Sequence, residues 1–321
     1  YNLAIYAMSN GESAAETKIT INDGTLNGNF MINAAMTNTM AANAIEINGG
    51  AFNGKYGVYS YSENAEKKAE TITIKGGSFS TLSSIVYLAD NCTYTLNSNV
   101  DDAETVVFYG KGTLDLNGKT ITTNGSYGVI KADGGCSIKN GKIVYTGTNA
   151  VIKVWNADKI EDINIQVTNT SGATIGGIVI QENSKGIGSI KNVTIKGAAL
   201  TNGIETYNCG DATENVIGSM ENVNIDAVGV AMNIYAPCGT ATNCTFKGGN
   251  YGIEIWIKGT YNATLDLVNC TVEGGGDYDV FAHDEYCGIC TTVIIKIVRF
   301  RNDERIEPFV YRTARSGTDA Y

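Results

Sequence analysis

Residues 190–195 read Ile-Lys-Asn-Val-Thr-Ile, and residues 220–225 read Met-Glu-Asn-Val-Asn-Ile. After the first asparagine of each stretch, apolar residues alternate with polar ones, which is the period of a β-strand with one buried face. Asparagine also tolerates the left-handed backbone conformation that a sharp bend requires. Each stretch therefore predicts a bend followed by a short strand whose apolar side chains enter a core.

The same phrase, an apolar residue, any residue, and then Asn, Asp or Gly, recurs along the chain. Its eleven copies follow one another at a fairly regular interval, and one of the eleven is degenerate, with Ser98 at the third position. The mean interval is about 25 residues, a period that indicates stacked repeats. A second phrase, a small residue before a β-branched one, falls between the copies. We assign the bends to a ladder of Asp23, Gly49, Gly76, Gly118, Asn140, Asp162, Asn192, Asn222, Asn243 and Asn269.

Strands this short cannot stand alone, and signals for two-residue hairpin turns are almost absent. Stacking each coil on the next, about 4.8 Å apart, satisfies the backbone through parallel ladders and buries one continuous core. Aligned asparagine side chains can also hydrogen-bond along the stack. The sequence therefore predicts an all-β, single-stranded parallel β-helix (a solenoid) of 11–12 coils, with three short strands per coil, over residues 1–290.

The coil period, the bend asparagine and the Gly-Ile strand resemble the right-handed parallel β-helix of the pectate-lyase-like superfamily, over about residues 15 to 300. Residues 113–121, Thr-Leu-Asp-Leu-Asn-Gly-Lys-Thr-Ile, look like phrases in large bacterial surface proteins with β-helix repeats. The resemblance implies a right-handed coil. It does not imply one activity, because this superfamily hosts lyases, hydrolases, adhesins and inert stalks.

Members of that superfamily that cleave polyuronates use an acidic cluster with calcium and an Arg base, or several Asp with a Gly-His-Gly and an Arg-x-Lys. In this chain the single histidine, His283, lies between Ala282 and Asp284, and all five arginines follow residue 298. No catalytic residue of the family can therefore be carried over. We expect no catalysis and no cofactor, with calcium as the cofactor if the chain is an enzyme.

The overall charge excludes one class of partner. A net charge of −10 and a pI of about 4.7 disfavour nucleic acid, which needs clustered Lys and Arg. No run of about eighteen apolar residues is present, so we expect no membrane insertion by this segment. The chain starts at Tyr1 without a basic and apolar leader, so we expect a mature product or a fragment of a larger protein.

The best candidate ligand surface lies on the Gly-Ile strands. Alternation along a strand directs Glu205 and Tyr207 outward, and Glu254 and Trp256 take the same positions two coils later. Tyr61 occupies the equivalent position near the start of the chain. Aromatic faces beside carboxylates suit stacking on sugar rings, so we expect a polysaccharide or host glycan as the partner. The alternative is that a long loop covers this face.

Cysteines suggest a second, weaker site. His283, Cys287 and Cys290 could supply three zinc ligands, but their spacing matches no zinc module that we can name. We favour a loop between the last two coils and expect no metal. Cys244 and Cys270 each follow a bend asparagine, so we expect inward-facing free thiols whose parallel side-chain vectors suit a disulfide poorly.

Residues 291–321 form the last coil and an atypical segment. Ile297 stands where Asn, Asp or Gly is expected, and Arg and Pro appear after it. Two hypotheses fit: a cap that closes the open end of the β-helix, or a non-native tail read in a different frame from the repeats.

The acidic, lightly charged and repetitive chain suits a rigid spacer. We expect a non-catalytic bacterial cell-surface or extracellular β-helix stalk or adhesion module, part of a larger surface protein, that binds glycan on its lateral face. The alternative is a polysaccharide lyase or glycoside hydrolase of the pectate-lyase-like superfamily.

Overall fold

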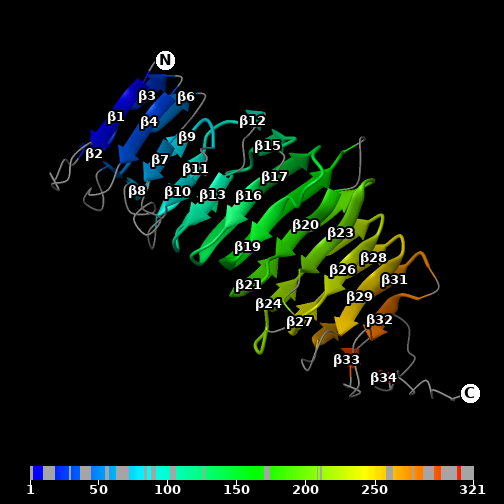
Figure 1. The fold of residues 1–321 in the computed structure, drawn as a ribbon. Helices are drawn as coiled ribbons and strands as arrows, with labels where there is room; N and C mark the ends of the chain where they lie inside the picture. Colours follow the sequence, from blue (N-terminus) through cyan, green and yellow to red (C-terminus); the bar gives the residue numbers. More distant parts are fainter. Residues whose placement is uncertain are drawn as a thin grey trace, which may run out of the picture.

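A computed structural model shows an all-β protein whose short strands stack in parallel as a β-solenoid of about eight turns (Figure 1). The described residues contain no helix. The structure describes residues 3–9, 19–28, 30–36, 45–54, 58–62, 72–82, 85–87, 92–101, 106–125, 127–169, 174–207, 209, 212–257, 263–276, 278–284, 293–297 and 309–311.

Most coils contribute a strand to each of three faces, and most strands pair in parallel with their counterparts on the neighbouring coils. The strands that precede the bend form the pre-bend face: β2 (Ile19–Ile21), β5 (Ile45–Ile47), β8 (Ile72–Ile74), β11 (Thr93–Leu96), β14 (Thr113–Asp115), β17 (Cys136–Tyr145), β19 (Asn156–Val167), β21 (Gly186–Lys191), β24 (Ile217–Glu221), β27 (Cys238–Thr242), β30 (Leu265–Val268) and β33 (Val293–Ile297). The strands that follow it form the post-bend face: β3 (Thr25–Gly28), β6 (Ala51–Gly54), β9 (Ser78–Phe79), β12 (Val100–Asp101), β15 (Thr120–Thr123), the second halves of β17 and β19, β22 (Thr194–Gly197), β25 (Asn224–Ala227), β28 (Thr245–Gly248) and β31 (Thr271–Gly274).

The third face closes each coil. Its last nine strands form one parallel sheet, whereas β1, β4 and β7 form a separate sheet of three. The strands are β1 (Leu3–Ser9), β4 (Phe30–Met36), β7 (Val58–Ser62), β10 (Ile85–Tyr87), β13 (Val106–Tyr109), β16 (Ile130–Ala132), β18 (Ile152–Val154), β20 (Thr174–Ile180), β23 (Leu200–Thr206), β26 (Val230–Ile234), β29 (Tyr251–Ile257) and β32 (Val280–Asp284).

The bends of the central coils carry a left-handed residue. Asn140, Asp162, Asn192, Asn222, Asn243 and Asn269 all have φ between 53° and 60°. Their side chains also connect successive coils, because the Asn192 amide donates to Asp162 Oδ1 at 2.8 Å and the Asn222 amide donates to Asn192 Oδ1 at 3.0 Å. A hydrogen-bonded column of Asp162, Asn192 and Asn222 therefore joins three successive coils at this edge of the solenoid.

The N-terminal bends differ by one residue from the predicted ladder. The left-handed φ falls on Gly24, Gly50 and Gly77, directly after the predicted Asp23, Gly49 and Gly76. At Gly118 both the predicted glycine and the preceding Asn117 are left-handed. The side-chain ladder is also displaced, because the Asn48 amide donates to Asn22 Oδ1 at 2.9 Å. The first coils therefore turn on glycine and place their asparagine one position before the predicted ladder residue.

The stack of strands is interrupted in the N-terminal third. Strands β2, β5 and β8 form a sheet of their own, and β11 pairs with β9 of the post-bend face on one side and with β14 on the other. The predicted bends at Gly76, Ser98 and Gly118 also follow one another at shorter intervals than the bends before them. The continuous stack therefore has about eight turns, not the expected 11–12 coils.

An aromatic column carries the core across this interruption. Phe52 and Phe79 stack with ring centroids 4.8 Å apart, and Phe79 and Tyr94 stack at 3.9 Å. The buried Tyr94 hydroxyl donates to the carbonyl of Thr81 at 2.6 Å, so its polar atom is satisfied. The core is therefore continuous here even though the sheets change partners.

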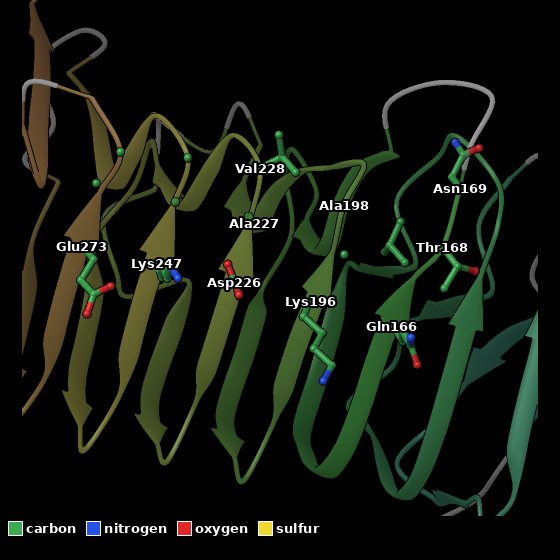
Figure 2. Close-up of a pocket in the computed structure, with 16 residues that line it drawn as sticks. Gln166, Thr168, Asn169, Lys196, Ala198, Asp226, Ala227, Val228, Lys247 and Glu273 are labelled. Atoms are coloured by element: carbon green, nitrogen blue, oxygen red, sulfur yellow. The ribbon is translucent and has the colours of Figure 1, made fainter.

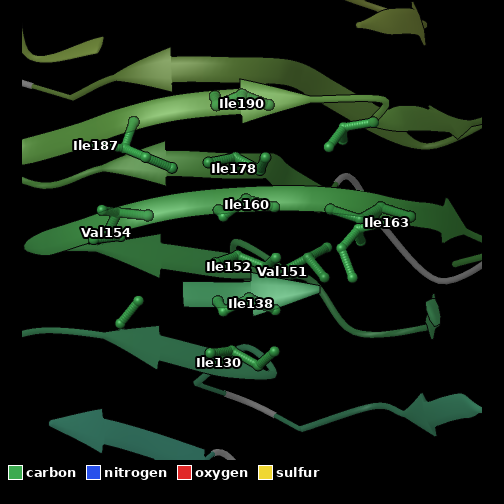
Figure 3. Close-up of a cluster of buried hydrophobic side chains, with 14 of the residues drawn as sticks. Ile130, Ile138, Val151, Ile152, Val154, Ile160, Ile163, Ile178, Ile187 and Ile190 are labelled. Atoms are coloured by element: carbon green, nitrogen blue, oxygen red, sulfur yellow. The ribbon is translucent and has the colours of Figure 1, made fainter. Parts of the chain in front are cut away.

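Isoleucine columns fill the central coils. Ile138, Ile160 and Ile190 are register partners on β17, β19 and β21, and all three are fully buried. Ile152 and Ile178 are partners on β18 and β20 of the third face and are equally buried (Figure 3). Burying one such side chain contributes about 1.5–3 kcal/mol relative to leaving it exposed.

The C-terminal strands end the stack differently. Strand β33 continues the pre-bend face by pairing in parallel with β30, and β34 (Phe309–Tyr311) then pairs with β33 in the antiparallel sense. Antiparallel pairing stops the repeat, because the chain reverses instead of starting another coil. The rest of residues 298–321 lies outside the described residues, so the cap and the non-native tail both remain hypotheses.

Candidate functional site

A polar row crosses the third face on three successive coils. Glu205 on β23, Asn233 on β26 and Glu254 on β29 are register partners. They alternate with core residues, yet only 5%, 6% and 8% of their respective surfaces are exposed. Asn202 lies nearby and its amide donates to Glu205 Oε2 at 3.1 Å. Two carboxylates and two amides are therefore gathered in a region that is largely shielded from water.

An aromatic row runs beside this polar row, two residues after Glu205, Asn233 and Glu254. Tyr235 and Trp256 stack nearly parallel, with ring centroids 5.8 Å apart and an angle of 7° between the planes. Tyr207 occupies the coil before them and is 51% exposed. Its backbone N–H continues the ladder by donating to the carbonyl of Ile180. The three rings therefore occupy successive coils, and the ring of Tyr207, at one end of the row, is open to solvent.

The electrostatics of the polar row follow from its burial. Burial raises the pKa of Glu205, the charge of Glu254 raises it further, and the hydrogen bond from Asn202 opposes both effects. The pKa of Tyr235 is also raised, first by burial and then by the Glu205 charge. Burial of the row therefore makes ionisation of Glu205 less favourable than ionisation of an exposed carboxyl group.

The predicted ligand residues are only partly brought together. Tyr207 and Trp256 lie two coils apart, as expected, but Glu205 and Glu254 are buried, which is closer to the covered-face alternative than to an exposed one. Tyr61 lies on β7, in the separate three-stranded sheet, and its side chain is outside the described residues.

Sequence reasoning missed Asn233 and Tyr235, which lie between the two predicted pairs. The small-apolar phrase of this coil, Gly229-Val230, does not align with Gly203-Ile204, because the structure pairs Val230 with Asn202 and Met232 with Ile204. The phrase on this coil is thus displaced by two residues. Aligning the coils after allowing for the different length of the loop before this strand would have placed Asn233 beside Glu205 and Tyr235 beside Tyr207.

A groove lies where the post-bend strands end, and it encloses about 840 Å³ (Figure 2). Thr168 and Asn169 line one end of it. A Cβ atom on Gly249 would lie 2.0 Å from the Val228 carbonyl oxygen, so the close approach of adjacent coils requires glycine there. The small residues lining the groove are Gly197, Ala198, Ala227, Gly248, Gly249, Gly274 and Gly275.

A row of charged side chains of alternating sign lies along the groove. Lys196, Asp226, Lys247 and Glu273 are register partners on β22, β25, β28 and β31, and all four are exposed (Figure 2). In the part of the chain that the structure describes, no ion pair within 4.0 Å joins any two of them. Their charges are therefore directed at solvent.

The pre-bend face carries a similar row that does pair internally. Asp115, Lys139, Glu161, Lys191 and Glu221 are successive register partners. Lys139 lies 3.6 Å from Asp115, and Lys191 lies 2.9 Å from Glu221. Ion pairs between side chains exposed to this extent stabilise a fold only weakly.

The structure leaves the metal hypothesis untested. His283 is the register partner of Trp256 on β32, while its side chain, Cys287 and Cys290 lie outside the described residues. Among the residues that are described, no group of three or more His, Cys, Asp or Glu is placed to hold a metal ion. Cys244 and Cys270 are buried free thiols, and the Cys244 N–H donates to Cys270 Sγ at 3.4 Å.

Comparison with known proteins finds no matching family model, no similar curated protein and no similar solved structure. The described residues also include no helix of the length and apolar character needed to cross a membrane. The fold is thus a parallel β-solenoid, and membership of the pectate-lyase-like superfamily stays an expectation.

Proposed function

We propose that this chain is a non-catalytic, extracellular β-solenoid module that acts as a rigid stalk and binds glycan through its third face. The observation that carries the proposal is the row formed by Tyr207, Tyr235 and Trp256 on successive coils, next to the Glu205–Asn233–Glu254 row. Flat apolar rings beside a few oriented polar groups suit a sugar ring, which has an apolar face and a hydroxyl rim.

The architecture also supports an extended ligand. Successive coils repeat at about 4.8 Å, so the three rings are spread over roughly 10 Å along the solenoid axis. An oligosaccharide lying along that axis would contact more than one ring, and Tyr207 would provide the exposed point of entry. The stalk role rests on the fold, because parallel ladders and one continuous core resist bending.

Binding to immobilised polysaccharides tests the proposal. We expect the wild-type chain to bind at least one acidic or neutral polysaccharide, and Tyr207→Ala to weaken that binding about tenfold or more, as loss of a stacked ring does. Tyr127→Ala is the matched control, because Tyr127 is a 66% exposed tyrosine on a different coil. Absence of binding to every polysaccharide, or equal losses in both variants, would contradict the proposal.

A hydrolase is the second candidate, and one observation favours it. Glu205 and Glu254 are buried two coils apart in the same row, and burial raises the pKa of Glu205. Inverting glycosidases use two carboxyl groups about 6.5–9.5 Å apart, one of which has a raised pKa and acts as the general acid. Release of new reducing ends by wild type, abolished in both Glu205→Gln and Glu254→Gln, would favour the hydrolase over the stalk.

A further inference from the structure

The exposed charge row of the post-bend face has a property that the pre-bend row lacks. It holds four alternating charges, Lys196, Asp226, Lys247 and Glu273, so its two ends carry opposite signs. A row that reads plus, minus, plus, minus in one direction reads minus, plus, minus, plus in the other. Such a row is complementary to its own reversed copy.

A two-fold axis achieves that reversal. Let two copies face each other across an axis that runs along the strand direction, between Asp226 and Lys247. This rotation keeps the strand direction and reverses the order of the coils. Lys196 then faces Glu273 of the second copy, and Asp226 faces Lys247 of the second copy. Symmetry supplies the two remaining contacts, so all four join opposite charges.

The rows on either side fit the same operation. Two residues before the charges lie Thr194, Asn224, Thr245 and Thr271, whose short side chains can donate and accept hydrogen bonds across the axis. Val228 lies two residues after Asp226, and this apolar residue has 54% of its surface exposed. In the dimer it would face Gly249 of the second copy, which lies two residues after Lys247. The single bulky group in that row thus meets a position without a side chain.

The pre-bend row fails the same test. It has five charges with Glu161 at its centre, so the same rotation would place Glu161 on itself and Asp115 against Glu221. Every contact would join like charges, and this row instead forms ion pairs within its own chain. An axis placed between two of its charges would join opposite charges but leave one end of the row unmatched, so only the post-bend row pairs every one of its charges with an opposite one.

We propose that the post-bend face is a dimerisation surface, on which a second copy of this chain docks through the Lys196–Asp226–Lys247–Glu273 row. The interface is polar, so the dimer forms at high protein concentration and weakens as salt rises. It leaves the third face free, because the two faces lie on different sides of each coil. Dimerisation would thus present two glycan-binding faces on antiparallel stalks.

Sedimentation velocity with charge-reversal variants tests this proposal. The wild type is expected to form a dimer at tens to hundreds of micromolar, as weak polar interfaces do, and to dissociate at high salt. Asp226→Lys and Lys247→Asp each place like charges at both central contacts, so each should weaken the dimer about tenfold or more. Circular dichroism checks that both variants keep the β fold.

Two rescues follow from the symmetry. A mixture of the Asp226→Lys and Lys247→Asp chains has opposite charges at every contact and should form a heterodimer. The double variant carrying both changes is again self-complementary and should dimerise like the wild type. Lys191→Asp on the pre-bend face should leave the dimer unchanged. A wild type that is monomeric at all concentrations, single variants that dimerise normally, or a mixture that stays monomeric would overturn the proposal.

Discussion

The N-terminal coils and the central coils solve the same folding problem with different residues. Central bends use a left-handed asparagine or aspartate whose side chain also bonds to the next coil. The first two N-terminal bends use a left-handed glycine, and the asparagine that bonds to the next coil lies two residues before it. One residue performs both tasks in the central coils, whereas two residues share them near the N-terminus. We infer that the central bends are the more sensitive to substitution.

The same division appears in the ladders. The nine-stranded sheet of the third face is unbroken from β10 to β32, whereas β2, β5 and β8 form an isolated sheet. Backbone hydrogen bonds along an unbroken ladder connect all its coils, so those coils should unfold together. The first coils should open separately and at lower free energy.

The largest expected effect comes from the core. Ile160→Ala removes a fully buried side chain from the central column and should lower the free energy of unfolding by about 2–5 kcal/mol. Ile47→Ala is the matched change in the N-terminal sheet, where the residue is equally buried. Urea unfolding with hydrogen exchange should show a global loss for the first and a loss confined to residues before 92 for the second. Equal global losses would show that the two regions are one cooperative unit.

The bend should give the next largest effect. Asn192→Ala removes amide bonds to two coils and forces alanine into a left-handed conformation, for a combined loss of about 2–3 kcal/mol. Asn192→Gly keeps the conformation accessible and should lose less. Asn48→Ala removes a hydrogen bond at a residue without a left-handed φ, so about 1 kcal/mol is expected. Thermal unfolding would rank the three, and an Asn48→Ala loss as large as that of Asn192→Ala would contradict the distinction.

The smallest effect depends on pH and is confined to the third face of the central coils. Burial and the charge of Glu254 raise the pKa of Glu205 in the folded chain. Ionising this carboxyl group therefore lowers the stability of the fold once the pH rises above the pKa that Glu205 has in the unfolded chain. Below that unfolded-state pKa, Glu205 is protonated in both the folded and the unfolded chain, so it does not lower the stability of the fold. Glu205→Gln should therefore raise the Tm near pH 8 and change it little near pH 4. Glu221→Gln, at a half-exposed position where Glu221 pairs with Lys191, is the control and should show no such gain.

The fold was predictable from local chemistry because a coil is a local unit. A bend residue and its alternating strand are visible in a six-residue stretch such as 190–195, and their recurrence implies stacking. The interruption at β11 was not predictable, since it depends on which strand of the previous coil lies within reach. Period alone specifies neither the partner nor the number of continuous turns.

The candidate site was harder to predict, for the same reason. Tyr207 and Trp256 could be found by alternation within their strands, but Asn233 required the register of a coil with a loop of different length. The burial of Glu205 depends on neighbours from other coils, which alternation does not reveal. The charge row of the post-bend face likewise exists only after coils of unequal length have been aligned with one another.

Methyl–methyl nuclear Overhauser contacts in an isoleucine-labelled sample test the central claim most directly. Stacked coils predict an unbroken chain of contacts from Ile138 to Ile160 to Ile190, and a second chain from Ile152 to Ile178 to Ile204, with each step crossing one full coil of sequence. Contacts restricted to residues close in sequence, or a pattern of antiparallel hairpins, would contradict the parallel solenoid and everything inferred from its register.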